Sequence, residues 1–395
     1  MKPVSSLSVL CILLLVAPAA ADDPEIEQDV VFAAGEDGYH TFRIPSLIAA
    51  DGVLLAFCEG RKDSGRDSGD IDLVLKRSTD GGRTWGELQV VWDDGPNTGG
   101  NPCPVVDRKT GRILLPMTKN LGEDDESEIK QRTGKGTRTV WICHSDDDGL
   151  TWSKPREITK SVKPDNWTWY ATGPGVGIQF AHGPHAGRLV VPCDHGMLHM
   201  NEEGVVENRQ GAHVIFSDDG GETWTHSEAV APKMNECQVV ELAGKTGGLL
   251  LDMRSYRGKG CRAQATSTDG GMTWTEPHDV PELIEPVCQA SLIRHSWPEN
   301  GQPGLLAFSN PADAKRRVNM SVRISADDGQ RWSDGLTLHA GPSAYSCLES
   351  LSDGTVACLY ERGEKSAYES IVIARVPAES VPDPSDEESM DSRSK

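Results

Sequence analysis

An eight-residue segment that occurs five times constrains this chain more than any other feature. Each copy, called a box below, follows the pattern Ser-x-Asp-x-Gly-x-Thr-Trp, except that Arg331 replaces Thr in the last copy. A single copy would carry little information, but five copies spaced by about 62 residues on average indicate an array of similar structural units. The copies occupy residues 78–85, 145–152, 217–224, 267–274 and 325–332.

The residue types in the box indicate a tight turn. A short Asp/Gly segment between two apolar runs is typical of a β-hairpin. The Asp carboxylate can accept hydrogen bonds from nearby backbone N–H groups, glycine supplies a positive φ, and the Trp can pack as an aromatic anchor. We therefore interpret the box aspartates as structural rather than catalytic. They are Asp80, Asp147, Asp219, Asp269 and Asp327.

Apolar runs of strand length surround each box. Residues 46–50, 53–57 and 71–75 precede the first box and residues 87–91 follow it, and the same order returns around the second box. No long segment has the 3.6-residue period of an amphipathic helix. Each box would thus join the third and fourth strands of a four-stranded sheet, and radial repetition of such sheets produces a β-propeller.

The spacing of the boxes also predicts the number of blades. Residues 29–376 hold about 350 residues, which corresponds to about six units. Five blades would carry a box, and the sixth would combine a strand near residues 30–32 with one near 371–374. Closing the ring with both chain ends removes open sheet edges. We predict an all-β fold, a six-bladed β-propeller with boxes in five blades, over residues 22–376.

The two ends of the chain differ from the repeats. Lys2, an apolar run at 7–16 and small residues at 19–21 are typical of a secretory signal peptide over residues 1–21. We expect a secreted or periplasmic protein without a stable membrane anchor in the mature chain, an uncleaved anchor being the alternative. Residues 377–395 are acidic and lack aromatic side chains, so we expect this tail to be disordered.

The formal net charge of −21 limits the classes of partner. It argues against binding to nucleic acid or to anionic membranes, and an anionic substrate would require a local basic pocket. Without Cys11, nine cysteines remain, and no Cys-x-x-Cys pair suggests a metal site. We expect most of these cysteines to be buried thiols, and the sequence leaves open whether one or two disulfides form. The inserts 122–138 and 197–211 are predicted to be solvated loops, a place at a pocket rim being the alternative.

Three arginines lie in apolar, strand-like settings on three different repeats. They are Arg43, Arg254 and Arg317. On a propeller they could converge at the central axis, where planar guanidinium forks suit bidentate capture of a carboxylate or phosphate. The alternative for each of them is a structural ion pair.

Together with the boxes, Phe42-Arg43-Ile44-Pro45 resembles the exo-α-sialidases (neuraminidases), which are six-bladed propellers with Asp-boxes, also called BNR repeats. The resemblance covers nearly all of residues 29–376. Boxes alone occur in other propellers, but the arginines and the Tyr and Glu segments make the resemblance specific. The further similar segments are 59–61, 67–72, 100–105, 171–175, 235–239, 286–289, 344–346 and 359–361.

This resemblance implies a role for each matching residue. The three arginines would bind the carboxylate of sialic acid, and Glu361 would orient the first of them. Tyr345 would be the nucleophile and Glu236 its base. Asp67 would be the general acid/base, with Asp63, Asp70 and Asp72 as neighbouring alternatives. The remaining residues implied to line the pocket are Glu59, Arg61 and Gln289.

The implied activity is retaining hydrolysis of terminal α-ketosidically linked sialic acids from glycoproteins, glycolipids and oligosaccharides, with neither a cofactor nor a metal. The pocket is expected on the axis, on the face opposite the boxes. One alternative is a trans-sialidase, or a hydrolase of another nonulosonic acid, on the same scaffold. Another is a non-catalytic glycan-binding propeller, although binding a carboxylate would need only the arginines and not the Asp, Glu and Tyr.

Overall fold

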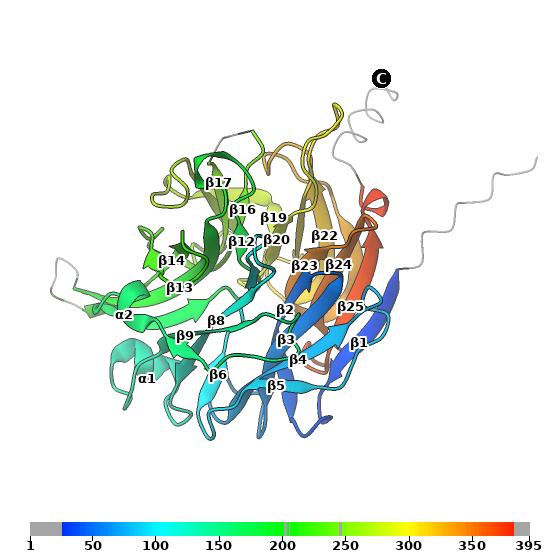
Figure 1. Ribbon diagram of the computed structural model, residues 1–395. Coiled ribbons are helices and arrows are strands. Elements are labelled where there is room, and N and C mark those ends of the chain that lie inside the picture. Colours follow the sequence, from blue (N-terminus) through cyan, green and yellow to red (C-terminus); the bar gives the residue numbers. More distant parts are fainter. Residues whose placement is uncertain (1–25, 201–203, 205, 245–246, 383–395) are drawn as a thin grey trace, which may run out of the picture.

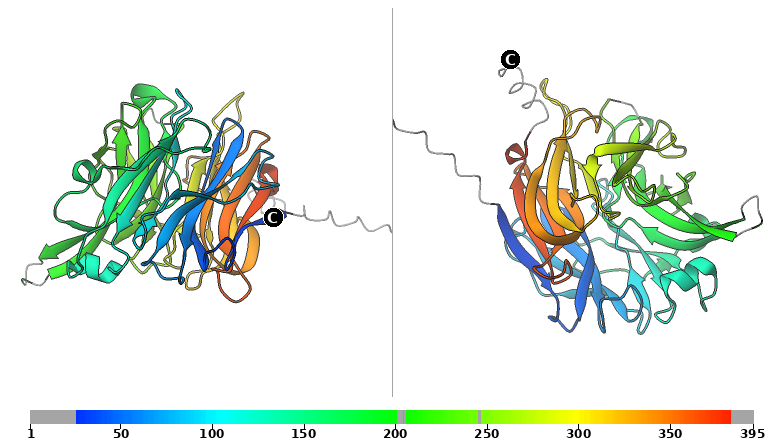
Figure 2. Two further views of the ribbon diagram at one scale, coloured as in Figure 1. Left: turned by 60° about the horizontal axis from the view of Figure 1, so that its bottom comes forward. Right: turned by 180° about the vertical axis from the view of Figure 1, so that it is seen from behind.

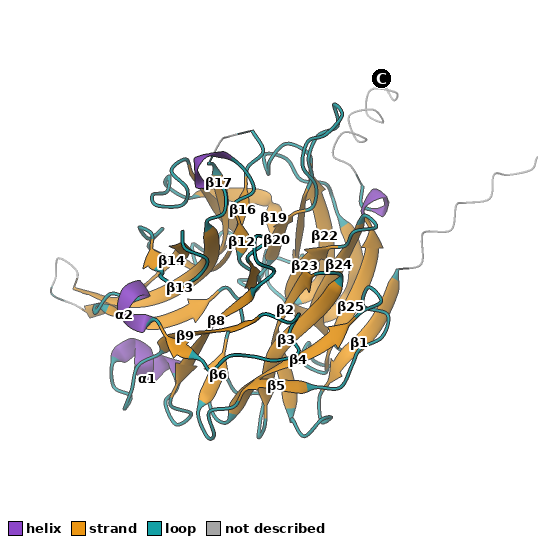
Figure 3. Cartoon of the chain, viewed as in Figure 1, coloured by secondary structure: helices purple, strands orange, loops and turns teal. Residues whose placement is uncertain are grey.

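The computed structural model describes residues 26–200, 204, 206–244 and 247–382. The expected signal peptide and residues 383–395 of the expected tail lie outside the described residues, whereas residues 377–382 of that tail are ordered, with helix η2 at Ala378–Ser380 and a buried Val381. Strands and loops make up nearly all of the described chain, and the helices are short (Figure 3). The helices are α1 (Glu126–Gln131), α2 (Thr159–Val162), η1 (Gly183–His185) and η2 (Ala378–Ser380).

The strands follow one another with short connections along the whole described chain. In chain order they are β1 (Glu27–Ala33), β2 (Thr41–Ala50), β3 (Val53–Arg61), β4 (Ile71–Ser78), β5 (Gln89–Trp92), β6 (Thr98–Gly100), β7 (Val105–Val106), β8 (Ile113–Asn120), β9 (Thr139–Ser145), β10 (Arg156–Glu157), β11 (Trp167–Thr172), β12 (Ile178–Gln179), β13 (Leu189–Met200), β14 (Val206–Ser217), β15 (Thr225–His226), β16 (Met234–Glu241), β17 (Leu249–Ser255), β18 (Cys261–Ser267), β19 (His278–Ile284), β20 (Ser291–Arg294), β21 (Leu306–Pro311), β22 (Val318–Ser325), β23 (Leu336–Ser350), β24 (Thr355–Arg362) and β25 (Ser370–Pro377).

Antiparallel pairing groups these strands into successive meanders. The first three are β2–β3–β4–β5, β7–β8–β9–β10 and β12–β13–β14–β15, with β11 also on β13. The next are β16–β17–β18–β19 and β20–β21–β22–β23. The last is β23–β24–β25–β1, so the long strand β23 serves two neighbouring sheets. The sheets surround a common centre (Figures 1 and 2), as expected for a propeller of six blades.

Both ends of the described chain lie in the last sheet. Strand β1 pairs antiparallel with β25, with Val30 opposite Val372 and Phe32 opposite Ile371. Phe32 and Ile371 are fully buried in the largest hydrophobic cluster, together with side chains of β2, β3 and β24. The prediction that the boxless blade combines both chain ends is confirmed, and this pairing closes the ring.

The boxes form the hydrogen-bonded turns that their sequence predicts. In the first box, Ser78 Oγ donates to Asp80 Oδ1 (2.8 Å), and Thr84 donates its N–H to Oδ1 (2.9 Å) and its hydroxyl to Oδ2 (2.6 Å). In the fifth box Arg331 Nε donates to Asp327 Oδ2 at 2.9 Å, in place of the missing Thr hydroxyl. Such bonds stabilise the ionised carboxylate, and those from Thr151 lower the pKa of Asp147 to about 2. The box aspartates are therefore structural.

The second glycine of the box also joins neighbouring blades. Gly221 has φ +91°, and a Cβ added to it would lie 2.7 Å from the Leu114 side chain of the preceding blade. A Cβ on Gly82 would lie 2.8 Å from Ile373 Cδ1 of the last blade. Only glycine permits both this backbone conformation and this approach. Each of these boxes thus closes a hairpin and packs on a neighbouring sheet.

One of the two inserts differs from its prediction. The solvated loop expected at 197–211 is wrong, because β13 and β14 continue as an antiparallel ribbon in which Met197 pairs with Arg209 and Met200 with Val206. The ribbon is partly exposed on both faces, so its polar sequence lacks the alternation that identifies a half-buried strand. The other insert, 122–138, contains helix α1.

The nine cysteines in the described residues are all buried free thiols, which confirms the expectation of small apolar side chains. Burial raises the pKa of thiols such as Cys143, to about 12, and so keeps them protonated. Within the described ranges no helix is long and apolar enough to cross a membrane.

Replacing Asp219 of the third box by Ala is expected to lower Tm by about 2 °C, because Thr223 and Ser217 lose their acceptor at an exposed turn. Differential scanning calorimetry measures the shift, with Glu87→Ala, a change at an exposed position outside the boxes, as the control. Equal Tm values for Asp219→Ala and the wild type would contradict a structural role for the box carboxylate.

Candidate active site

A polar pocket of about 240 Å³ opens on the axis at the end opposite the boxes. On β3, Leu54 pairs with the box residue Ser78, whereas Arg61 at the other end of the strand pairs with Ile71 and lines the pocket. The expected position of the pocket is therefore confirmed. Its lining residues are Arg43, Ile44, Glu59, Arg61, Asp67, Asn101, Glu126, Arg138, Trp169, Ala171, Asp194, Asn235, Glu236, Arg254, Tyr256, Arg317, Tyr345 and Tyr368.

The three predicted arginines line this one pocket although they come from three sheets. Arg43 lies on β2, Arg254 on β17, and Arg317 directly precedes β22. Arg317 donates to Tyr368 Oη at 3.1 Å and to the Val287 carbonyl at 3.5 Å, and the partners found for it in the described part of the chain are neutral. Guanidinium groups arranged in this way can bind a small anion.

Glu361, on β24 and fully buried, lies behind Arg43. Its Oε1 accepts hydrogen bonds from Arg43 Nε (3.0 Å) and the Ile44 N–H (2.9 Å). Its Oε2 accepts from Arg43 Nη2 (3.3 Å) and the Tyr345 N–H (3.1 Å). One carboxylate therefore orients the Arg43 guanidinium and fixes the backbone of Tyr345.

Tyr345, Glu236 and Arg254 form a hydrogen-bonded group at the pocket. Tyr345 Oη donates to Glu236 Oε1 at 2.6 Å, and Arg254 Nη1 donates to Glu236 Oε2 at 2.7 Å and to Tyr345 Oη at 3.2 Å. Burial and then the Glu236 charge raise the pKa of Tyr345 well above its ordinary value, although Arg254 and Arg317 oppose this. The phenol is therefore neutral, and a carboxylate lies in position to take its proton.

Asp67 lies at the pocket mouth on the loop between β3 and β4, and its side chain is 63% exposed. Its Oδ1 lies 2.7 Å from Arg61 Nη2 and 3.5 Å from Arg43 Nη1. Partial burial raises the pKa of Asp67, but the two guanidinium groups outweigh this effect and lower it. An anion that binds Arg43 would weaken this effect and move the pKa of Asp67 upward.

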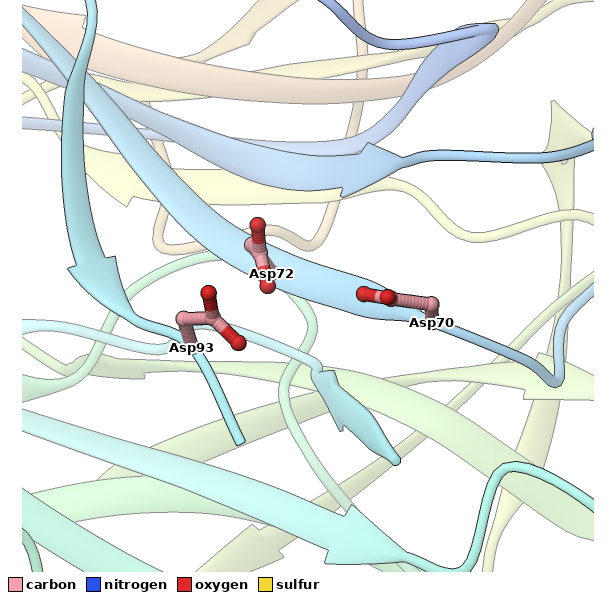
Figure 4. A group of neighbouring side chains, drawn as sticks. All are labelled: Asp70, Asp72 and Asp93. Atoms are coloured by element: carbon pink, nitrogen blue, oxygen red, sulfur yellow. The ribbon is translucent and has the colours of Figure 1, made fainter. Parts of the chain in front are cut away.

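The alternatives to Asp67 do not line the pocket. Asp63 is exposed, while Asp70 and Asp72 lie with Asp93 in a separate group of carboxylates (Figure 4). Lys62 Nζ lies 2.9 Å from Asp70 Oδ1, 3.1 Å from Asp72 Oδ2 and 3.6 Å from Asp93 Oδ2, so it supplies a positive charge to all three. Position therefore favours Asp67 as the carboxyl that can reach a bound ligand.

Glu59 and Arg61 line the pocket, as the resemblance implies, and Gln289 does not. Glu59 Oε2 accepts from Arg61 Nη2 at 2.7 Å, and its Oε1 accepts from the Asn101 N–H at 3.0 Å. Gln289 is buried behind Tyr345, where its amide pairs with the backbone N–H and carbonyl of Ser346 at 3.0 and 2.9 Å. Gln289 therefore supports the backbone next to Tyr345 and does not form part of the pocket surface.

Several lining residues were not predicted, and Arg138 is the most informative of them. It is buried over the Trp169 ring, 4.3 Å from the ring centre, and donates to Asn101 Oδ1 and to Thr118 Oγ1 (3.0 Å). Arg138 and Glu126 both belong to the insert 122–138, so the alternative of a pocket rim is confirmed. In the sequence Arg138 lies between two threonines, whereas Arg43 follows Phe42 and Arg254 follows Met253. The other lining residues that the prediction did not name are Ile44, Asn101, Trp169, Ala171, Asp194, Asn235, Tyr256 and Tyr368.

A family model described as a BNR repeat-like domain matches residues 52–358. A sialidase of Micromonospora viridifaciens is 35% identical over 376 residues, which cover 90% of this chain and 55% of that protein. An exo-alpha-sialidase of Arthroderma benhamiae is 32% identical, with 83% of this chain and 81% of that protein covered. A solved Hadza microbial sialidase shares 33% identity and a TM-score of 0.78, with 90% of this chain and 69% of that chain covered.

Two further comparisons concern coverage and fold. The chain spans 55% and 61% of the length of two bacterial sialidases that it matches, from Micromonospora viridifaciens and Bacteroides fragilis. The intramolecular trans-sialidase of Ruminococcus gnavus has a TM-score of 0.70 at 22% identity, which shows a shared fold.

Replacing Glu361 by Gln is expected to lower the free energy of unfolding by about 3 kcal/mol, because the buried Arg43 guanidinium loses its anionic partner. Asp67 is too exposed to replace it. Urea denaturation measures the change, and in an Arg43→Met background the same substitution should cost much less because no buried cation remains. An equal loss of unfolding free energy for Glu361→Gln in the wild type and in the Arg43→Met variant would contradict the coupling of Glu361 and Arg43.

Proposed function

This chain belongs to the sialidase family with BNR repeats, and from that membership we propose that it is an exo-α-sialidase that hydrolyses terminal α-ketosidically linked sialic acids of glycans. The 2.6 Å contact between Tyr345 Oη and Glu236 Oε1, in a pocket lined by three guanidinium groups, carries this proposal. A pocket that only bound a carboxylate would need the guanidinium groups without an activated phenol.

Substrate binding would begin with the carboxylate of sialic acid at Arg43, Arg254 and Arg317. The net charge of −21 repels anions in general, so the attraction has to be local to the pocket. Arg317 has neutral partners among the described residues and is ready to accept a carboxylate. Binding by planar forks fixes the orientation of the sugar as well as its position.

Tyr345 would act as the nucleophile. The anomeric carbon of a sialoside carries a carboxylate, which repels an anionic nucleophile, and sialidases are an exception to the paired carboxylates of most glycosidases. The neutral phenol would approach the anomeric carbon and transfer its proton to Glu236 as the bond from Oη to that carbon forms. Arg254, which donates to Tyr345 Oη and to the other Glu236 oxygen, Oε2, would stabilise the charge as it moves between the two groups.

Asp67 would protonate the leaving oxygen as the glycosidic bond breaks. In the second half of the reaction it would take a proton from water, whose oxygen attacks the anomeric carbon while the bond to Tyr345 breaks and the phenol recovers its proton from Glu236. Two displacements at one carbon retain its configuration. The exposed position of Asp67 at the pocket mouth suits a group that meets both the leaving sugar and water.

Tyr345→Phe is expected to lower kcat for a fluorogenic α-sialoside by on the order of 10³-fold or more, because no oxygen remains to form the covalent bond. Tyr368→Phe is the matched control, since Tyr368 lines the same pocket and its hydroxyl accepts a hydrogen bond from Arg317 Nη1. This control should mainly raise KM. Equal turnover by wild type and Tyr345→Phe would refute the nucleophile, and an inactive folded wild type would refute the proposed sialidase.

The loss of activity caused by Asp67→Asn is expected to depend on the leaving group of the substrate. Hydrolysis of a sialyllactose should fall by about 10²- to 10⁴-fold, because its sugar alkoxide needs a proton to depart. Formation of the covalent intermediate from a sialoside with an acidic phenol leaving group should fall much less, and a pre-steady-state burst of the phenol measures it. Equal losses on both substrates would exclude Asp67 as the acid.

A further inference from the structure

The loop between β3 and β4 that carries Asp67 is bound on both sides of this residue by one carboxylate from a different part of the chain. That carboxylate is Asp125, which directly precedes helix α1 in the insert 122–138 (Figure 1 locates α1, β3 and β4). Ser68 Oγ donates to Asp125 Oδ1 at 2.7 Å. Arg66 Nη2 donates to Asp125 Oδ1 at 3.0 Å and to Oδ2 at 3.2 Å. Asp125 therefore contacts both chain neighbours of Asp67 and links this loop to the insert.

Other contacts hold the ends of the same loop. The Lys62 N–H donates to the Asp70 carbonyl at 3.1 Å, which closes the base of the loop. Near its end, Thr98 Oγ1 donates to the Gly69 carbonyl at 2.9 Å and accepts from the Gly69 N–H at 3.2 Å. Because the ends are fixed in this way, the placement of the side chain at the tip depends on the contacts made between them.

Asp67 needs support from its neighbours because its own contacts depend on its charge. As a carboxylate its Oδ1 lies 2.7 Å from Arg61 and 3.5 Å from Arg43, and Arg61 also donates to the Gly65 carbonyl at 2.7 Å. A general acid has to be protonated before it donates, and a neutral carboxyl attracts guanidinium groups much less than a carboxylate does. The bonds from its two neighbours to Asp125 do not involve the Asp67 carboxyl, so they persist when Asp67 is protonated.

The two bonds to Asp125 differ in strength. The hydrogen bond from Ser68 lowers the pKa of Asp125, and the charge of Arg66 adds to this effect, so the carboxyl stays ionised. The side chains of Arg66 and Asp125 are 68% and 47% exposed, and an ion pair between such exposed groups contributes little. Ser68 is half-buried and donates to a charged acceptor, which makes its bond the stronger of the two.

We propose that Asp125 is a positioning residue for the general acid: by binding Ser68 and Arg66 it fixes the backbone around Asp67 and keeps the protonated carboxyl at the leaving oxygen. This inference rests on the proposed function. Asp125 does not line the pocket, so it acts through the loop and not on the substrate. Its effect should therefore appear where the leaving oxygen needs a proton and disappear where it does not.

The test compares two α-sialosides that differ in the leaving group, a sialyllactose and a sialoside of an acidic phenol. The quantity measured is kcat/KM, which reports the steps up to release of the leaving group. Ser68→Ala and Asp125→Ala are each expected to lower kcat/KM on the sialyllactose by about five- to tenfold and on the phenol sialoside by less than about twofold. The double variant should lose about as much as Asp125→Ala alone, because both substitutions remove the same contact.

Two control variants separate positioning of the loop from the start of helix α1. Asp125→Asn keeps an acceptor for Ser68 and a residue type suited to a helix N-cap, and it should stay within about threefold of wild type on both substrates. Glu128 accepts the Asp125 N–H at 2.9 Å through its side chain, and this bond belongs to the helix start and not to the loop. Glu128→Ala should therefore stay within about twofold of wild type on both substrates.

The outcomes distinguish this inference from the proposed function. Equal losses on the two substrates for Asp125→Ala would overturn the positioning role, because a general defect of the pocket does not depend on the leaving group. Wild-type activity of Asp125→Ala on the sialyllactose would overturn it as well. A wild type that cleaves neither sialoside would refute the sialidase activity itself. Losses confined to the sialyllactose, with Glu128→Ala unaffected, would support both.

Discussion

The buried carboxylate of Glu361 is the constraint on which the site and the closure of the ring both depend. It accepts hydrogen bonds from Arg43 Nε, Arg43 Nη2 and the backbone N–H groups of Ile44 and Tyr345. These residues belong to the first and last sheets of the ring, which the pairing of β1 with β25 completes. A single side chain thus joins the anion-binding arginine, the phenol backbone and the seam of the propeller.

Paired charges allow an acidic protein to hold a site for an anion. Glu361 pairs with Arg43, Glu236 with Arg254, and Glu59 with Arg61, whereas Arg317 bonds to neutral oxygens in the described part of the chain. Each carboxylate orients a guanidinium group and still leaves other N–H donors of that group for a ligand. Asp194 is the exception, because its buried carboxyl accepts from the Asn235 amide, and burial and then the Glu236 charge raise the pKa of Asp194 well above its ordinary value.

The fold and the charged half of the site could be predicted because their signals are local. The boxes repeat, Arg43 and Arg254 interrupt apolar runs in which a charge is conspicuous, and Arg317 directly precedes a strand-like run. Arg138 and Asp194 could not be predicted, since their roles depend on contacts with Trp169, Asn101 and Asn235, which lie 31 or more residues away in the sequence. Gln289 was placed on the pocket surface because its segment resembles the family, yet its amide pairs with the backbone behind Tyr345.

The residue types that adopt positive φ differ between the two ends of the propeller. At the box end, positive φ values fall mainly on glycines such as Gly82 and Gly221, where they cost little. At the pocket end they include Ile44 and Val287, β-branched residues for which this conformation costs about 1–3 kcal/mol each. Ile44 is held by Glu361, and the Val287 carbonyl meets Arg317. The closely packed sheets and boxes stabilise the ring enough to keep this strained backbone next to the arginines that bind the ligand.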